Sequence, residues 1–212
     1  MDVSHPIRGI IPTLDAPVIE ALARTTRGLS GREVHRLAGM GSVRGVQLVL
    51  ARLVAQGLVR AEEHPGVTLY TANRDHVAWP ALETLVGIPN ALMELLRSEI
   101  ASWPIEPVHV SLFGSIARRD GDARSDIDLL VIRPDASTVT RETWDSQVDG
   151  LRDAVVRWTG NRCQIFEVDR SRLREHVLAD DPLVANWLHD AVTLAGPGLA
   201  GLVAGLALPR AP

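Results

Sequence analysis

Residues 112–132, LFGSIARRDGDARSDIDLLVI, constrain the fold of this chain more than any other stretch. The apolar residues at both ends predict two strands, and the Gly-Ser pair after the first predicts a tight turn into a short helix. Asp126 and Asp128 stand two apart at the start of the second strand, so both side chains point to one face of it. The stretch therefore predicts an α/β domain that places two carboxylates opposite a glycine turn.

These residue types suit the binding of a magnesium–triphosphate complex. Gly114 has no Cβ and lets the backbone approach a phosphate, while Ser115 opens the helix with a hydroxyl and free N–H groups. Two carboxylates on one face suit Mg²⁺, which prefers oxygen ligands and bridges to phosphates. An Asp-x-Asp pair can also be no more than the start of a strand, and a Gly-Ser pair no more than a turn. Ten residues separate Ser115 from Asp126, with strands on both sides, and this spacing favours the functional interpretation.

In this stretch the chain resembles the minimal nucleotidyltransferases, a bacterial and archaeal branch of the DNA polymerase β superfamily. The resemblance rests on the pattern G-S-x(10)-D-x-D, the Ala-Arg pair, the serine before the first aspartate, and the flanking apolar strands. It implies transfer of a nucleoside monophosphate, expected to be AMP, from ATP or another NTP to a hydroxyl. Acceptors in such families are proteins, often a toxin-like partner, or small molecules such as aminoglycosides. We expect a protein acceptor here, because the domain is short and has no obvious acceptor-binding extension.

The resemblance also assigns roles to the residues that match. It implies that Asp126 and Asp128 are the catalytic residues and ligate Mg²⁺, with two ions expected. The nucleotide would be bound by the remaining matched residues: Gly114, Ser115, Arg118 and Ser125. Arg119 is a further candidate for charge at the phosphates.

One position departs from the pattern of this family, which usually supplies a third carboxylate from a later strand, four residues past a glycine. Gly160 precedes a predicted strand at 163–168, and the expected position is occupied by Gln164. Glu167 has the opposite parity, so it becomes a metal ligand only if the strand bulges. A second function therefore stays open, a transcription regulator whose transferase fold is a catalytically weak nucleotide sensor. An interaction scaffold that uses neither activity is a third.

The N-terminal third, residues 12–75, predicts a winged helix-turn-helix domain. Capping residues and apolar spacing predict helices and then a hairpin, in the order 15–26, 30–39, 42–56, 58–62 and 67–71. Residues 53–73 resemble the recognition-helix end and wing of many bacterial transcription regulators. On this interpretation Ser42, Arg44 and Gln47 approach the major groove, and Arg60 contacts phosphates.

Other uses of this module stay open, because winged helices also serve in dimerisation and protein docking. Glu62 and Glu63 lie on the predicted wing, where they would repel a phosphate. With DNA binding, we expect a homodimer that reads paired half-sites and an autoregulatory role beside a toxin-like partner.

The rest of the chain completes the expected architecture. A helical linker at 76–104 is predicted as two helices, 80–85 and 91–103, broken at 87–90. A polymerase-β-like nucleotidyltransferase domain follows at 105–195, with a tail at 196–212. Its later elements are expected to be a helix, a strand, two helices and an edge strand, at 138–159, 163–168, 171–179, 182–189 and 191–195. The expected fold class is α/β, with a mixed sheet and helices.

Composition narrows the setting. The single cysteine, Cys163, excludes an internal disulfide framework and fits a reducing compartment. No apolar run is long enough for a membrane span, and the N-terminus does not resemble a signal peptide, so we expect a cytoplasmic protein without a membrane partner. All 22 basic residues are Arg, which is typical of a GC-rich bacterial genome and weakens arginine as a sign of phosphate binding.

Overall fold

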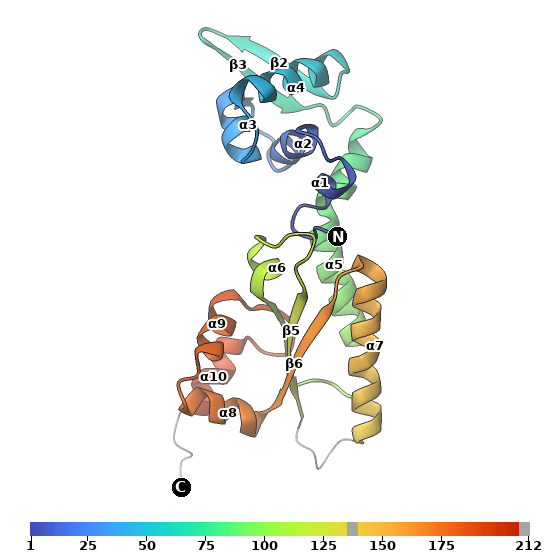
Figure 1. Cartoon of the computed structure of the whole chain (residues 1–212), viewed down its shortest axis with the longest axis vertical. Helices are drawn as coiled ribbons and strands as arrows, with labels where there is room; N and C mark the ends of the chain where they lie inside the picture. Colours follow the sequence, from blue (N-terminus) through green and yellow to red (C-terminus); the bar gives the residue numbers. More distant parts are fainter. Residues whose placement is uncertain (135–139, 208–212) are drawn as a thin grey trace. The chain divides into compact units, whose positions relative to one another are not determined.

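The computed structural model describes residues 1–134 and 140–207, and the chain divides into two compact units (Figure 1). The N-terminal unit is His5–Pro89. The C-terminal unit combines Met1–Ser4 with Asn90–Pro212. The division at Pro89 lies within the segment that was predicted as a linker.

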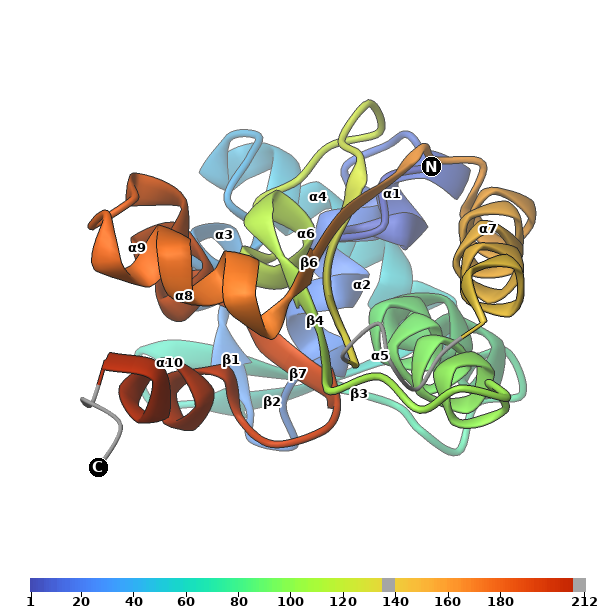
Figure 2. The same cartoon turned by 90° about the horizontal axis from the view of Figure 1, so that it is seen from below.

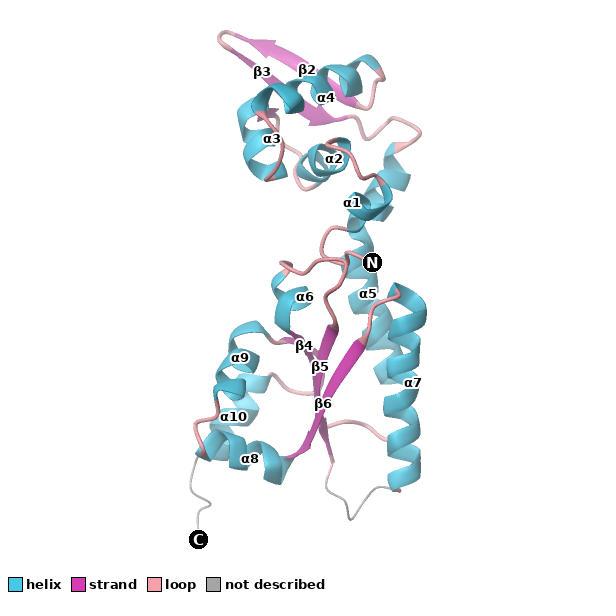
Figure 3. Ribbon diagram, viewed as in Figure 1, coloured by secondary structure: helices cyan, strands magenta, loops and turns pink. Residues whose placement is uncertain are grey.

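The N-terminal unit combines short helices with a small sheet (Figure 3). Its elements are α1 (Pro6–Ile10), α2 (Asp15–Ala23), β1 (Leu29–Ser30), α3 (Gly31–Ala38), α4 (Val43–Ala55), β2 (Val59–His64), β3 (Val67–Ala72) and the first part of α5 (Trp79–Ala101). The sheet has the order β1-β3-β2, with antiparallel pairing throughout. Sequence analysis missed α1 and β1, and the winged-helix assignment stays a prediction.

The helix starts of this unit follow from side-chain caps. The Ser30 hydroxyl accepts from the Glu33 N–H at 3.3 Å, and the Glu33 carboxylate accepts from the Ser30 N–H at 2.8 Å. Hydrogen bonds to the Glu33 carboxylate, first from the Ser30 N–H and then from the Ser30 hydroxyl, lower the pKa of Glu33 to about 2. Ser42 caps α4 by accepting from the Gly45 N–H at 3.0 Å. The capping box and the third helix predicted from sequence are confirmed.

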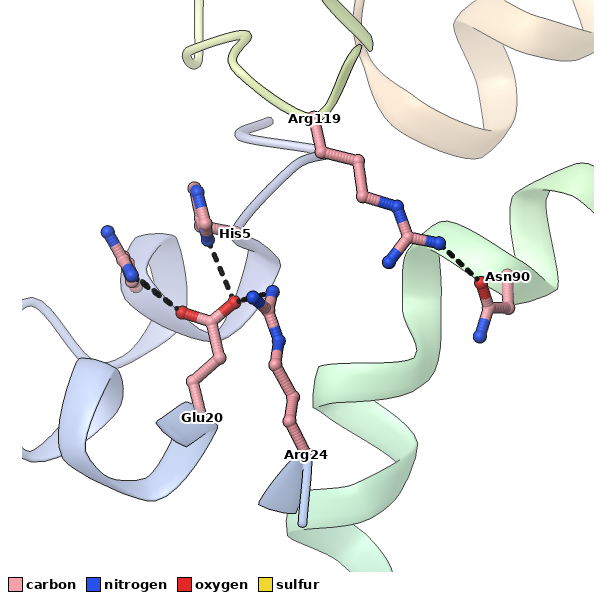
Figure 4. A network of polar contacts seen from close by, with 6 residues as sticks. His5, Glu20, Arg24, Asn90 and Arg119 are labelled. Atoms are coloured by element: carbon pink, nitrogen blue, oxygen red, sulfur yellow. Dashed lines mark hydrogen bonds and ion pairs between the residues drawn. The ribbon is translucent and has the colours of Figure 1, made fainter. Parts of the chain in front are cut away.

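A buried carboxylate joins the first two helices of the unit. The Glu20 side chain is 4% exposed and accepts from His5 Nδ1 at 2.8 Å, Arg8 Nε at 2.9 Å and Arg24 Nη2 at 2.6 Å (Figure 4). A buried charge is tolerated only with such partners, because its desolvation is costly. The network therefore holds α1 against α2.

The C-terminal unit is built around a mixed sheet in the order β6-β5-β4-β7 (Figure 3). Strands β5 and β6 run parallel, and the other pairs are antiparallel. Besides the second part of α5, its elements are β4 (His109–Phe113), α6 (Gly114–Arg118), β5 (Ile127–Arg133), α7 (Arg141–Thr159), β6 (Cys163–Asp169), α8 (Arg170–Leu178), α9 (Pro182–Asp190), β7 (Val192–Ala195) and α10 (Leu199–Ala207). The expected α/β class with a mixed sheet is confirmed, and β7 is an edge strand as predicted.

Helices cover both faces of this sheet (Figures 1 and 2). Alternate residues of β5 serve two cores. Ile127, Leu129 and Val131 pack with α5 and α7, whereas Leu130 and Ile132 pack with α8, α9 and α10. A strand buried on both faces reads as a continuous apolar run, which explains the sequence after Asp128.

The first four residues belong to the core of this unit. Val3 is 1% exposed and packs in the cluster of α5 and α7. Asn161 Nδ2 donates to the carbonyl oxygens of Met1 and Ser125, each at 2.9 Å, and Asn161 Oδ1 accepts from the Met1 nitrogen at 2.7 Å. The N-terminal segment Met1–Ser4 is thus fastened beside the loop that precedes Asp126.

One expectation for the helices was wrong. The predicted break at 87–90 is absent from the described chain, because α5 continues through Pro89. Leu82, Leu85 and Val86 before Pro89 pack in one core, and Leu92, Leu96 and Ile100 after it pack in the other. This burial outweighs the backbone hydrogen bond that a proline removes.

The predicted tail contains the helix α10, which its glycine and alanine content concealed. The tail's entry is fixed to β4, because the carbonyl of Pro197 accepts from His109 Nδ1 at 2.8 Å. Burial lowers the pKa of His109, so the ring is neutral and structural. Thr138, the predicted start of the helix seen as α7, and residues 208–212 of the tail lie outside the described residues.

Candidate functional site

The two aspartates of the D-x-D pair lie at the start of β5, on the face that looks toward α8, α9 and α10. Asp128 is the register partner of Phe113 in the neighbouring strand β4, and Asp126 directly precedes β5. Ile127, between them, is fully buried on the opposite face. Strand alternation therefore brings the two carboxylates together, as the sequence predicts.

The two carboxylates repel each other and are half-buried. Desolvation, and then the charge of Asp126, raises the pKa of Asp128, while the Arg118 guanidinium opposes the rise. Both effects disfavour a second negative charge at this place. A cation bound between the aspartates would relieve the repulsion.

The Gly114 turn lies directly against this pair. Gly114 has a φ of +73°, and a Cβ at this position would stand 2.6 Å from Asp128 Oδ2. Both its backbone conformation and the neighbouring carboxylate exclude a side chain. Glycine is therefore required at this position beside Asp128.

The loop 119–125 brings the two predicted serines together. A Cβ on the buried Gly121 would stand 3.2 Å from both Ser115 Oγ and Ser125 Oγ. The Ser125 hydroxyl accepts from the Asp122 N–H at 2.8 Å. This hydrogen bond stabilises the loop in the absence of a ligand. Sequence analysis missed Gly121, and the D-G-D run in this loop was the available signal.

Gln164 occupies the position predicted from the glycine spacing. It pairs with Asp128 in the parallel register of β5 and β6, and its Nε2 donates to Asp126 Oδ2 at 3.2 Å. Rotation of the amide would instead present its oxygen. The third member of this cluster is thus an amide and not a carboxylate.

Glu167, the conditional metal ligand, does not join the pair. It follows the parity of Cys163 and Ile165, which pack on the α7 side, and the strand has no bulge that would turn it. Its carboxylate lies 3.7 Å from Arg133 Nε. Asp169 is also engaged, because it caps α8 through the Arg172 N–H and accepts from Arg133 Nη2. The bulge on which a metal-ligand role for Glu167 depended is therefore absent from β6.

The two arginines near the motif have protein partners. Arg118 Nε donates to Asp120 Oδ2 at 3.0 Å, and Arg118 Nη1 contacts Asp190 at the end of α9. Arg119 Nη2 donates to Asn90 Oδ1 at 3.1 Å (Figure 4). Arg118 remains beside Asp128, as its effect on the Asp128 pKa indicates. Asp190 was not predicted, since it lies 72 positions away from Arg118 in the chain.

The predicted DNA-contacting residues belong to the N-terminal unit. Arg44 and Gln47 are exposed on α4, and Ser42, also exposed, caps that helix. Arg60 on β2 forms an exposed ion pair with Asp75. The structure therefore leaves Arg44 and Gln47 available and gives Arg60 an acidic neighbour.

The comparison with protein families bears on the C-terminal unit. Residues 92–178 match the family model described as "Nucleotidyltransferase domain". This part of the chain is thus similar to nucleotidyltransferase domains. The match runs from α5 to α8 and includes the Gly114 turn, both aspartates and Gln164. The predicted enzyme class is confirmed.

Solved structures give only a loose likeness to this chain. A crystal structure of a toxin–antitoxin with AMP-PNP is 21% identical, with a TM-score of 0.34. A mutant of the toxin–antitoxin MntA–HpeT is 19% identical, with a TM-score of 0.33. Each match covers 56% of this chain and 82% of the other. Likenesses this loose carry no inference about function. Among curated proteins, none matches this sequence.

The donor set of the nucleotidyltransferase domain fits a hard cation. Within residues 1–134 and 140–207, no group of three or more His, Cys, Asp and Glu side chains could hold a metal ion. Asp126 and Asp128, with the amide of Gln164, offer oxygen ligands on one face. Mg²⁺ is commonly bound by one or two carboxylates together with substrate phosphates, so the pair fits a magnesium–nucleotide complex.

The length and hydropathy of the helices bear on whether the chain could cross a membrane. No single helix of the described chain is long and apolar enough to cross a membrane. One bent pair, α3 with α4, meets the criterion by length and composition only. The apolar residues of that pair, including Val34, Val46 and Leu50, are buried in the core of the N-terminal unit.

Proposed function

We propose that this protein transfers a nucleoside monophosphate, expected to be AMP, from a magnesium-bound NTP to a hydroxyl of a protein or a small molecule. The observation that supports it most is the half-buried pair Asp126 and Asp128, which lies against the Gly114 turn within a nucleotidyltransferase domain. Among the described residues neither carboxylate forms an ion pair, and Asp126 accepts a hydrogen bond from the neutral Gln164.

The residues of the site divide the work of binding and transfer. Asp126 and Asp128 would hold the ion, and the repulsion between them makes binding of a cation favourable. Bound Mg²⁺ would polarise the phosphate and offset the charge of the leaving pyrophosphate. Gly114 lets the turn lie directly against Asp128, Ser115 offers a hydroxyl, and Arg118 adds positive charge near Asp128.

Gln164 sets a limit on catalysis. An amide cannot take the proton of an acceptor hydroxyl at neutral pH, and it neutralises no second cation. We therefore propose one firmly held Mg²⁺, a second ion that arrives with the nucleotide, and slow turnover. The same residue supports the alternative function, a transcription regulator whose transferase fold senses nucleotide without consuming it.

A labelling experiment separates these functions. The full chain is incubated with Mg²⁺, ATP labelled at the α-phosphate, and acceptors of two classes, namely a toxin-like protein encoded beside it and aminoglycosides. If the protein is a transferase, we expect label on one acceptor and release of an equal amount of pyrophosphate. The variant in which Asp126 and Asp128 are both replaced by Asn should give neither. Nucleotide binding without pyrophosphate release would establish the sensor and exclude the transferase reaction.

We further propose that the N-terminal unit is a winged helix that binds duplex DNA and regulates its own operon, as a homodimer. The exposed Arg44 and Gln47 on α4 and the sheet order β1-β3-β2 support this proposal. Arg44→Ala should weaken binding by about tenfold, which is the size of one lost charged contact. Arg97→Ala, which removes an exposed arginine of the C-terminal unit, is the matched control. Equal binding by both variants, or no DNA selected from a random pool, would contradict the proposal.

A further inference from the structure

Asp190 carries a carboxylate that is largely shielded from solvent. It is the last residue of α9, and its side chain is 7% exposed. Two side chains contact it, Arg118 through Nη1 and His189 through Nδ1, the latter at 2.6 Å. The hydrogen bond from His189, and then that from Arg118, lowers the pKa of Asp190. The carboxylate is therefore ionised at neutral pH.

An anion at this place is costly for the helix that carries it. The C-terminal end of a helix bears partial negative charge, and a buried carboxylate also loses its hydration. The attachment of α9 does not require it, because Val184 and Trp187 already bury the helix in the core that it shares with α8 and α10. The charge is thus better explained by its effect on Arg118 than by the packing of α9.

Arg118 is the residue through which Asp190 reaches the site. It ends the short helix that begins at Gly114, and its charge acts on Asp128. Its Nε contacts Asp120 and its Nη1 contacts Asp190. Among the described residues, the second terminal nitrogen, Nη2, has no hydrogen-bond partner. The guanidinium is therefore fixed on two sides and retains donors for a third group.

We infer that Asp190 is a positioning residue that holds the Arg118 guanidinium beside Asp128, with free donors for the phosphates of the nucleotide. This inference rests on the proposed function. A long side chain that is already ordered loses less entropy when it binds, and a fixed guanidinium can present paired donors to a phosphate. Asp190 thus acts on the nucleotide through Arg118, and α9 contributes to a site that the family match to residues 92–178 does not include.

The test is a double-mutant cycle in the full chain, read as the dissociation constant of a non-hydrolysable ATP analogue with Mg²⁺ by calorimetry. Asp190→Asn should weaken binding by about 10- to 150-fold, the range of one charged hydrogen bond. Asp190→Glu should recover part of that loss. Asp190→Asn should add no further loss to Arg118→Ala, because both variants remove the same fixed guanidinium.

Asp181→Asn is the matched control for stability. Asp181 caps the N-terminus of the same helix and contacts His176, so its loss should lower the melting temperature without changing nucleotide affinity. Wild-type affinity for Asp190→Asn, or additive losses in the cycle, would overturn the inference alone. A wild-type chain that binds no nucleotide would overturn the proposed function as well.

Discussion

Replacing Gly114 by alanine tests the geometry on which the site depends. Gly114 and Gly160 have nearly the same backbone conformation, with φ of +73° and +71°. A Cβ in this left-handed region costs about 1–2 kcal/mol at either position. The surroundings differ, because a Cβ at Gly160 meets nothing within 4 Å, whereas one at Gly114 stands 2.6 Å from Asp128 Oδ2. Gly160→Ala is therefore a control with the same strain and no contact with the site.

The two variants should share one effect and differ in another. Each should lower the melting temperature by about 3–8 °C, the shift that 1–2 kcal/mol produces in a unit of this size. Only Gly114→Ala should displace the Asp128 carboxylate, by several tenths of an ångström, since a Cβ closer than 3.0 Å forces its neighbour to move. Metal sites tolerate errors of about 0.2 Å in ligand distance, and Mg²⁺ demands near-ideal geometry. We expect at least a tenfold loss, about 1.4 kcal/mol, in affinity for the magnesium–nucleotide complex.

The assay is thermal unfolding followed by circular dichroism, with and without Mg²⁺ and a non-hydrolysable ATP analogue. A ligand that binds only the folded state raises its melting temperature, so wild type and Gly160→Ala should show the same ligand-induced increase. Gly114→Ala should show little or none. A full increase for Gly114→Ala would refute the reasoning, because phosphate and metal would then not depend on the close approach of the turn to Asp128.

Three further predictions concern Asp128, Gln164 and Cys163. Folding raises the pKa of Asp128 above its ordinary 3.8, so the folded state binds that proton more tightly and loses stability as the pH rises through this range. Asp128→Asn should therefore melt higher than wild type at pH 7 but not at pH 3, while nucleotide binding is lost; a lower melting temperature at pH 7 would contradict this. Gln164→Glu should lower the melting temperature without metal, through repulsion from Asp126, and should increase Mn²⁺ affinity and pyrophosphate release. Unchanged metal affinity would show that this side chain does not reach the ion. Burial raises the pKa of Cys163 to about 12, so its thiol should react with iodoacetamide at pH 8 only after unfolding in urea, and rapid alkylation of the native chain would place it outside the core.

Local patterns predicted the parts of the site that lie on one strand or one turn. Alternation placed both aspartates on one face, and the glycine spacing placed Gln164 beside them. Caps such as Ser30 and Ser42 fixed helix starts to within a residue. These features depend on neighbours a few positions away, and a sequence displays such neighbours directly.

The features that were missed depend on contacts between distant segments. Asp190 contacts Arg118 across 72 positions, and no periodicity marks that pair. Pro89 gave a strong local signal for a break, but burial on both sides of it kept α5 continuous. Glu167 has a carboxylate that could bind a metal ion, but it lies on the face of β6 opposite Gln164, where it forms an ion pair with Arg133. Tertiary packing decided each of these outcomes.

The placement of Met1–Ser4 makes the N-terminal unit an insertion in the chain of the C-terminal one. The polypeptide passes between the units twice, at Ser4–His5 and at Pro89–Asn90. Truncation at Asn90 would remove Val3 from a filled core and leave Asn161 without its Met1 partners. A transferase fragment that retains its native interior thus needs Ser4 spliced to Asn90 through a short linker, and one protease cut at Pro89 would not part the two units.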